Sequence, residues 1–236
     1  MNVVAIAPAN ADPLAGGFYT VREAARLIGS TPSQVIASWL KDRGNGVPPV
    51  IRRQYEPLAG KQELGFLDLI EVRFVEHFRK QGYSLQSLRK AAEIARLELK
   101  CQHPFALYGA KFIGERKNIF LKVAKESGDT SLLNLVTRLY AMYDVLEEIL
   151  SRSLTFDPTT GLATRWKPRD KEFPHVIVDP KIAFGQPVIE PAGVPTEAIH
   201  ATWKAEGGSY PATAEWFGIG ESLVQEAVEF ELALPN

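Results

Sequence analysis

The sequence contains very little cysteine and no long apolar run. Its single cysteine, Cys101, cannot form a disulfide within the chain, and no cluster of cysteine and histidine with the spacing of metal ligands surrounds it. A reducing cytoplasm is therefore the expected location. No apolar stretch approaches the roughly 20 residues that a membrane-spanning helix needs, and tandem repeats are absent. These absences exclude a disulfide-bonded domain, a cysteine-based metal site, a membrane span and a solenoid.

The sequence also lacks a recognisable catalytic set. Asp179 stands before Pro180, where an aspartate is most simply a turn former. We therefore expect neither an enzyme nor a bound cofactor or metal. No acid, base and nucleophile can be assembled from the spacing of the four histidines, which are His77, His103, His175 and His200.

Charge is distributed unevenly along a chain that is nearly neutral overall. The formal net charge is −1 and 45% of the residues are hydrophobic, which is enough to build a core. Residues 18–125 hold 19 basic and 10 acidic side chains, a net charge of +9, whereas residues 126–236 hold 8 and 17, a net charge of −9. The sequence therefore predicts a globular protein with a basic half and an acidic half.

The first ordered segment has the pattern of two short helices joined by a turn. Thr20 and Glu23 form a capping box that predicts a helix ending at Gly29. Thr31 is expected to cap a second helix that starts at Pro32. This pattern is typical of a helix-turn-helix, although ordinary helical domains also show it. The buried stripe expected on the second helix is Val35, Ile36, Trp39 and Leu40.

The next segment mixes turn formers with strand and helix patterns. Residues 44–65 are rich in glycine and proline around a β-prone stretch at residues 50–55, which predicts a two-stranded wing. Helical periodicity then predicts a helix from Phe66 to Gly82 and another from Leu85 to about Lys100, capped by Ser84. Residues 110–113 and 118–123 flank a polar turn, which predicts a hairpin.

The second half begins with the longest amphipathic stretch, at residues 132–150. It suits a helix that bridges domains or mediates dimerisation, and equally a core helix of one domain. Residues 154–175 contain three prolines and several charges, which predicts an extended linker. A short β entry at residues 176–189 and two or three short helices between residues 195 and 234 should then complete a compact module.

Together these patterns predict a mainly α protein. Its parts are a winged helix-turn-helix N-terminal domain with a small β-hairpin, a long bridging helix, and a small helical C-terminal domain with a short β entry. The expected boundaries are a disordered tail at residues 1–17, a winged helix-turn-helix domain with a hairpin at 18–127, a bridging helix and linker at 128–172, and the C-terminal domain at 173–236.

The N-terminal part resembles the MerR-type winged helix-turn-helix. The matching segments are residues 19–29, Val35 and Trp39, residues 66–69, and Gly82-Tyr83-Ser84-Leu85. In that family the second helix enters the major groove and the wing contacts phosphates, so the resemblance implies DNA binding. It places Ser33, Gln34 and Ser38 against bases, and it places the following residues against phosphates: Arg22, Lys41, Arg43, Arg52, Arg53 and Lys61.

The second helix departs from the family in its lack of positive charge. It contains no arginine or lysine before Lys41, so the bidentate contact of arginine with guanine is not available there. Gln34 could still pair with adenine. The basic residues lie mostly outside this helix, so the charge argues for DNA affinity more than for the choice of sequence.

The C-terminal part resembles a small uncharacterised domain of bacterial antitoxins that are encoded beside PIN-like ribonuclease toxins. The matching residues are Asp179-Pro180, the run Gly185-Gln186-Pro187-Val188-Ile189, and Val194-Pro195. The family usually continues after this run with Arg-Gly-Thr-Arg, and this chain has residues 190–193, Glu-Pro-Ala-Gly, instead.

The two segments in this order resemble a VapB-type antitoxin that begins with a helix-turn-helix. The resemblance implies a cytoplasmic repressor that binds its own operator DNA as a homodimer and neutralises a PIN-like ribonuclease toxin. Candidate toxin-binding residues are the tryptophans and glutamates of the acidic half, although these could equally pack a small core and form a solvated face. They are Trp203, Trp216, Glu221 and Glu226.

Two other functions remain open on the sequence. A MerR-like transcription regulator would use the C-terminal module to sense a small molecule. A protein-interaction scaffold would keep the helix-turn-helix fold without binding DNA, which is consistent with the low charge of the second helix.

Overall fold

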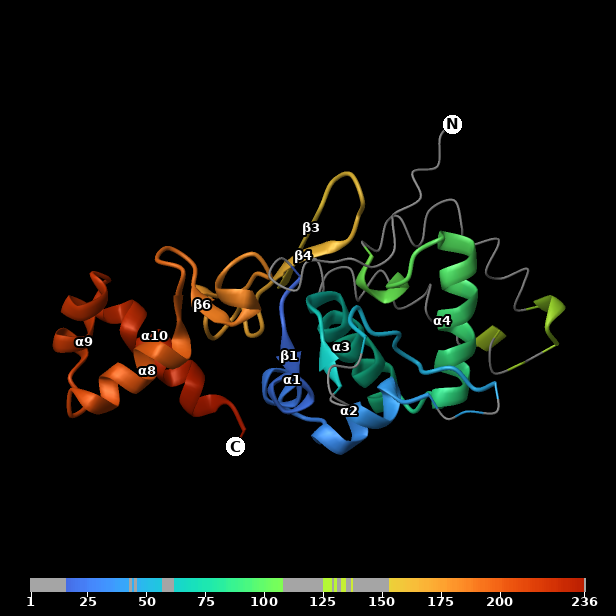
Figure 1. The fold of residues 1–236 in the computed structure, drawn as a ribbon, viewed down its shortest axis with the longest axis horizontal. Helices are drawn as coiled ribbons and strands as arrows, with labels where there is room; N and C mark the ends of the chain where they lie inside the picture. Colours follow the sequence, from blue (N-terminus) through green and yellow to red (C-terminus); the bar gives the residue numbers. More distant parts are fainter. Residues whose placement is uncertain are drawn as a thin grey trace.

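The computed structural model describes residues 16–42, 44, 46–56, 62–107, 125–128, 130, 133, 134, 137 and 153–235. In Figure 1 helices α2, α3 and α4 lie at one end of the molecule and α8, α9 and α10 at the other, with β3 and β4 between them. The predicted hairpin at residues 110–123, most of the predicted bridging helix and nearly all of the predicted tail lie outside the described residues.

Short helices and two short strands form the N-terminal half. The capping box is confirmed, because the Thr20 side chain accepts from the Glu23 amide and the Glu23 side chain accepts from the Thr20 amide. Gly29 ends α1 in the left-handed conformation with φ of 86°, and Ser84 caps α4 as predicted. The elements are β1 (Tyr19–Thr20), α1 (Val21–Ile28), α2 (Ser33–Leu40), β2 (Glu63–Leu64), α3 (Phe66–Lys80), α4 (Leu85–Leu99) and the 3₁₀ helix η1 (Pro104–Ala106).

The start and the buried face of α2 differ from the prediction. Pro32 is the N-cap and no side chain caps the helix, because the Thr31 hydroxyl donates to the Glu76 carboxylate, 2.7 Å away, instead. Val35 is 41% exposed. Ile36, Trp39 and Leu40 form the buried face of the helix. Val35 lies at the edge of that face.

The two-stranded wing predicted for residues 44–65 is not confirmed by the described residues. Among the described residues of that segment, the only strand is β2, and it pairs antiparallel with β1 through Tyr19 opposite Leu64 and Thr20 opposite Glu63. The β-prone stretch packs into the core instead. Val50 and Ile51 are fully buried, and both of their amides donate to the Trp39 carbonyl.

Helix α3 is the centre of the N-terminal core. Phe66, Leu69, Val75 and Phe78 are all buried, and Phe74 stacks on Phe105 of η1 with ring centroids 4.2 Å apart. The helix also buries three carboxylates on its length, which are Asp68, Glu71 and Glu76.

The C-terminal half contains a larger sheet than the predicted β entry. Its five strands follow the order β3-β4-β5-β6-β7, and every neighbouring pair is antiparallel. The described residues therefore form a mixed α and β fold rather than a mainly α one. The strands are β3 (Leu154–Phe156), β4 (Ala163–Trp166), β5 (Val176–Val178), β6 (Pro187–Ile189) and β7 (Val194–Pro195).

Strands β3 and β4 correct the prediction of an extended linker at residues 154–175. Leu154 pairs with Trp166, and Trp166 pairs in turn with Val178 of β5. All three side chains are buried. The three prolines that suggested a linker lie in the turns between these strands, as do the charges other than Arg165 of β4.

Three helices complete the C-terminal half and confirm the predicted helical module. Helix α8 (Thr196–Ala205) and α10 (Glu221–Ala233) pack against each other and against β6, and α9 (Tyr210–Phe217) contacts both. Ser209 caps α9, which ends at Gly218 in the left-handed conformation. No helix in the described part of the chain is both long and apolar enough to cross a membrane.

Candidate functional site

A buried glutamate fixes the turn that joins α1 and α2. Glu76 of α3 is only 7% exposed, and its carboxylate accepts hydrogen bonds from the hydroxyls of Ser30 and Thr31. Lys80 lies 3.5 Å from the same carboxylate and donates to Ser30. Hydrogen bonds to a buried charge are among the stronger ones, so α3 sets the direction in which α2 leaves the turn.

Three of the predicted DNA-binding residues meet on this surface. Arg22, Ser33 and Gln34 line one polar hollow of about 570 Å³ together with the turn residues and Pro235 near the end of the chain. Arg22 and Gln34 are exposed. The fold thus brings a cation and two short polar side chains together beside the start of α2.

The other predicted DNA-binding residues lie apart from the hollow. Ser38 is half-buried and donates to the Val35 carbonyl of its own helix at 2.6 Å. Lys41 is exposed directly after α2. Arg52 is paired with Glu93 of α4, with Nη2 2.7 Å from Oε2. Arg53 is half-buried, and its Nη1 makes no hydrogen bond to a described residue. Arg43 and Lys61 lie outside the described residues.

The two halves of the molecule are joined through β1 and a strained loop. The Phe18 amide donates to the Phe184 carbonyl at 3.0 Å, and the buried Tyr19 hydroxyl donates to the Gly185 carbonyl at 2.8 Å. Ala183, Phe184 and Gly185 all have positive φ, at 47°, 55° and 85°, which is unfavourable for the two residues that carry a Cβ. Burial and nearby negative charge raise the pKa of Tyr19 well above its usual value, so the hydroxyl stays protonated and remains a donor.

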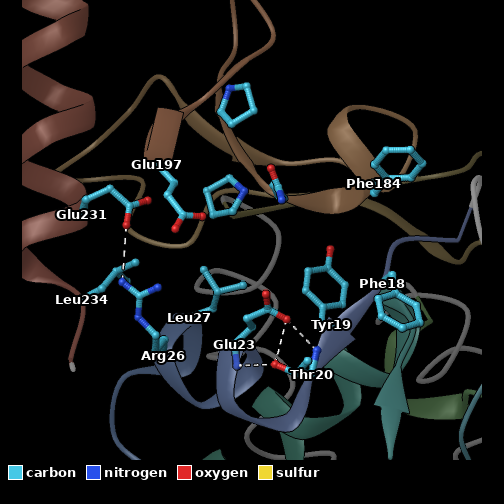
Figure 2. Close-up of a pocket in the computed structure, with 13 residues that line it drawn as sticks. Phe18, Tyr19, Thr20, Glu23, Arg26, Leu27, Phe184, Glu197, Glu231 and Leu234 are labelled. Carbon is cyan, nitrogen blue, oxygen red and sulfur yellow. Dashed lines mark hydrogen bonds and ion pairs between the residues drawn. The ribbon is translucent and has the colours of Figure 1, made fainter. Parts of the chain in front are cut away.

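An inter-domain cleft opens beside this junction. Its volume is about 430 Å³, which is within the range of ligand-binding sites. Phe18 and residues of β1 and α1 form one wall, and residues between Phe184 and Leu234 form the other. Figure 2 shows Phe18 and Phe184 at one end of the cleft and Arg26, Glu231 and Leu234 at the other.

The charged groups of the cleft are mostly carboxylates. Glu23, Glu197 and Glu231 line it, with Arg26 as the cation among its lining residues. Arg26 is already engaged, because its Nη2 lies 3.4 Å from Glu231 and its Nε donates to the Pro235 carbonyl at 3.2 Å. The cleft therefore has an apolar surface with an excess of negative charge.

The two candidate tryptophans of the acidic half differ in their surroundings. Trp203 is half-buried, stacks on His200 and lies in a tilted arrangement against Tyr210, and thus belongs to the packing of the helical module. Trp216 is 72% exposed, with its indole N–H donating to Glu206 at 3.0 Å. Trp216 is the more accessible of the two.

The two candidate glutamates also differ. Glu221 is exposed in the first turn of α10, where its negative charge favours the helix. Glu226 accepts a hydrogen bond from the His175 amide at 2.7 Å, and its other oxygen lies 2.8 Å from the His175 ring. Glu226 thus links α10 to the residue that precedes β5.

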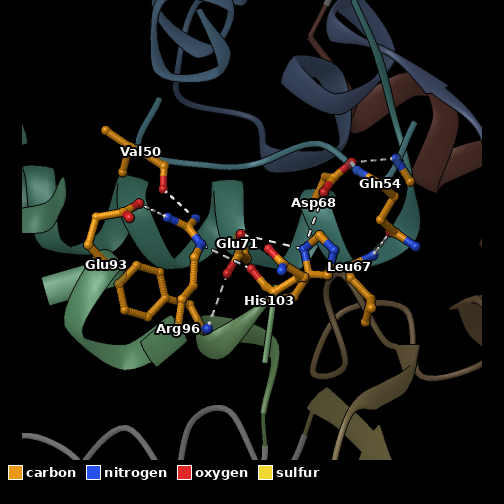
Figure 3. A network of polar contacts seen from close by, with 11 residues as sticks. Val50, Gln54, Leu67, Asp68, Glu71, Glu93, Arg96 and His103 are labelled. Carbon is orange, nitrogen blue, oxygen red and sulfur yellow. Dashed lines mark hydrogen bonds and ion pairs between the residues drawn. The ribbon is translucent and has the colours of Figure 1, made fainter. Parts of the chain in front are cut away.

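A buried ionisable cluster in the N-terminal half was not predicted from the sequence. Figure 3 shows His103 facing Asp68 and Glu71 of α3. Nδ1 of His103 lies 3.4 Å from Asp68 and 3.7 Å from Glu71, and both carboxylates are fully buried. Asp68 also accepts from the amides of Gln54 and Gly65. The i, i+3 spacing of two acids in the apolar first half of the helix was the available signal.

This cluster has the characteristics of a structural element. It is surrounded by core residues, and Glu71 accepts from the Phe105 amide. Within the described ranges, no group of three or more histidine, cysteine, aspartate or glutamate side chains is placed to hold a metal ion.

Comparison with known proteins finds similarity along nearly the whole chain. The protein named "Putative antitoxin VapB45" of Mycobacterium tuberculosis is similar to this chain. The two are 23% identical over 227 residues, which cover 89% of this chain and 92% of that protein. No family model matches the sequence.

A solved structure has the same overall fold. The crystal structure of Rv2018 from Mycobacterium tuberculosis matches with a TM-score of 0.66 at 22% identity, covering 89% of this chain and 96% of that chain. Since the match spans both halves, the arrangement of the helices and the sheet in this chain also occurs in a protein of similar length.

Proposed function

We propose that this chain is the antitoxin of a toxin–antitoxin system. The observation that carries the proposal is the similarity to an antitoxin-named protein over 89% of this chain and 92% of the relative. A match of that extent includes both halves, so it supports a common role for the whole chain rather than a shared module. The cytoplasm is the compartment where such a protein would act.

The basic half is proposed to bind operator DNA as a winged helix-turn-helix of the MerR type. The exposed Gln34 and the neighbouring Ser33 and Arg22 support this, because they lie together at the start of α2, and side chains at this end of a recognition helix reach base edges. A homodimer would place two such surfaces on a two-fold symmetric operator.

The acidic half is proposed to bind a PIN-like ribonuclease. A nuclease must present positive charge to RNA, so an anionic partner can compete with its substrate. The net charge of −9 over residues 126–236 and the exposed Trp216 and Glu221 support this assignment. Tryptophan is frequent among the residues that dominate binding energy.

Co-expression with the product of the neighbouring gene tests the antitoxin proposal. We expect that product to arrest growth when it is expressed alone, and this chain to restore growth and to co-purify with it. If growth is not restored and no complex forms, the proposal is wrong.

A ligand-responsive transcription regulator is the second candidate, and the inter-domain cleft favours it. Its volume of about 430 Å³ suits a small molecule, and its walls come from both halves. This candidate predicts saturable binding of a small ligand that changes DNA affinity, and it predicts that the neighbouring gene does not encode a toxin.

A protein-interaction scaffold that does not bind DNA is the third candidate. It predicts no gel shift on the chain's own promoter even at low salt.

A further inference from the structure

We propose that the inter-domain cleft is a docking site for a segment of the ribonuclease partner that carries apolar side chains beside lysine or arginine. The inference rests on the proposed function and adds to it the place where the partner binds. The sequence-based expectation instead named Trp203, Trp216, Glu221 and Glu226 as partner-binding residues, and none of them lines the cleft.

Two exposed aromatic rings mark the entrance of the cleft. Phe18 is 43% exposed and Phe184 is 56% exposed, and both line the cleft together with Tyr19. Large aromatic side chains are seldom left in solvent without a partner, and they are enriched at the centres of interfaces. The pair provides a surface for an apolar side chain.

The backbone around Phe184 is held in a strained form that presents this ring. Ala183 and Phe184 both have positive φ, and the conformation is fixed by the hydrogen bonds from Phe18 and Tyr19 to the carbonyls of Phe184 and Gly185. Strain of this kind persists where the surrounding structure enforces it, and it is concentrated at functional sites. The strained residues form η2 (Ala183–Gly185), which lies between β5 and β6, and a segment that only connected these two strands would not require the strain.

The charge of the cleft selects the kind of partner. Glu197 is exposed in the first turn of α8, and it has no ion pair with another described residue. Arg26 is engaged by Glu231 and the Pro235 carbonyl. An incoming lysine or arginine near Glu197 would therefore gain a partner, whereas an incoming carboxylate would be repelled. A nuclease that binds RNA has such basic segments on its surface.

The position of the cleft links partner binding to the DNA-binding surface. Arg26 lines both the cleft and the polar hollow that contains Arg22 and Gln34, and Pro235 reaches that hollow from the C-terminal half. A segment bound in the cleft would contact α1 and α10 at once. Occupation of the cleft is therefore expected to alter the DNA affinity of α2.

The test uses full-length variants and the purified product of the neighbouring gene. Phe184→Gly removes the ring and suits the positive φ, so the loop keeps its conformation. Glu197→Lys reverses the charge of an exposed side chain. Each is expected to weaken binding of that product about tenfold or more in isothermal titration calorimetry.

The matched control variants change residues that lie outside the cleft. Leu232→Ser removes an exposed apolar side chain, and Glu172→Lys reverses an exposed charge. Both are expected to bind within about twofold of the unmodified chain.

Photocrosslinking identifies the occupant directly. With benzoylphenylalanine in place of Phe184, we expect crosslinks to a segment of the partner that holds lysine or arginine next to apolar residues. Crosslinks to a second copy of this chain, or to an acidic segment, would overturn the inference. If the unmodified chain binds the product of the neighbouring gene and the two cleft variants bind it equally well, the docking site is wrong while the antitoxin proposal stands. If the unmodified chain does not bind that product, the docking site and the antitoxin proposal are both wrong.

Discussion

Asp68, Glu71 and His103 place two carboxylates and one imidazole in the core of the N-terminal half. Burial raises the pKa of Asp68 to about 6, against the attraction of His103 and two backbone N–H groups. Burial opposes the charged form of His103, but its contact with Glu71 and the charge of Asp68 outweigh burial and raise its pKa. The imidazolium therefore compensates two buried negative charges near neutral pH.

The pH dependence of stability follows from the directions of the two pKa shifts. The folded protein keeps a proton on Asp68 that the unfolded chain releases between about pH 4 and pH 6, so this group lowers stability as pH rises through that window. His103 contributes stability below its unfolded pKa of about 6.5, and that contribution is lost as pH rises through its higher folded pKa.

We expect His103→Gln to destabilise the fold by about 3–5 kcal/mol near pH 7, because it leaves two buried carboxylates without a cation. The variant should also lose less stability than the unmodified chain as pH rises above about 6.5, because the contribution of His103 that is lost there is already absent. Urea unfolding at pH 7 and across this pH range measures both effects. His175→Gln is the control, because that imidazole is half exposed and contacts a single carboxylate, and it should cost about 1 kcal/mol or less. Equal effects of the two substitutions would contradict this account.

Gly185 provides a second test at the scale of one residue. It has φ of 85°, and an added Cβ would overlap the Tyr19 hydroxyl that joins the two halves. Gly207 also has positive φ, at 65°, with nothing within 4 Å of an added Cβ. Gly185→Ala should therefore destabilise by about 1–3 kcal/mol more than Gly207→Ala, as measured by chemical denaturation. Identical losses would show that the junction does not depend on this contact.

At the scale of elements, the turn between α1 and α2 depends on α3. Glu76→Ala removes the acceptor of Ser30 and Thr31, and it should destabilise by about 2–3 kcal/mol. It should also weaken binding to the chain's own promoter in gel shifts, although Glu76 is buried and cannot contact DNA. Glu172→Ala, at an exposed position far along the chain, is the control. An unchanged DNA affinity would mean that α2 does not need this turn or does not read DNA.

Elements with local signals were predicted well from the sequence. The capping box of Thr20 and Glu23, the glycine that ends α1 and the serine that caps α4 each act over a few residues, so their patterns are complete in the sequence. The linker prediction at residues 154–175 failed for the opposite reason. Strands of three or four residues, such as β3 and β4, are stabilised by pairing with distant partners, and their own sequence has little periodicity.

The candidate site was predictable in part for the same reason. The helix pattern placed Arg22, Ser33 and Gln34 correctly on neighbouring helices, and the fold brings them together. The inter-domain cleft could not be predicted, because Phe18 and Phe184 are far apart in sequence and meet only through the contact between the halves. The pairing of Arg52 with Glu93 likewise depends on how α4 packs.

At the scale of the whole molecule, the basic half should show the salt dependence of phosphate binding. Lys41 is exposed and has no ion pair within the described part of the chain, whereas Arg52 is held by Glu93. We expect Lys41→Ala to weaken promoter binding more than Arg52→Ala. It should also flatten the log–log salt dependence by about 0.9 for the lost phosphate contact. Binding measured by fluorescence anisotropy across a salt series checks this, and a slope unchanged by Lys41→Ala would contradict it.

We propose that the whole chain neutralises a ribonuclease, and inhibition of RNA cleavage in vitro is the experiment that decides this. The purified product of the neighbouring gene is mixed with increasing amounts of this chain, and cleavage of a labelled RNA is followed. We expect RNA cleavage to fall to background once the chain reaches an equimolar amount. Cleavage that continues undiminished in a large excess of the chain would contradict it.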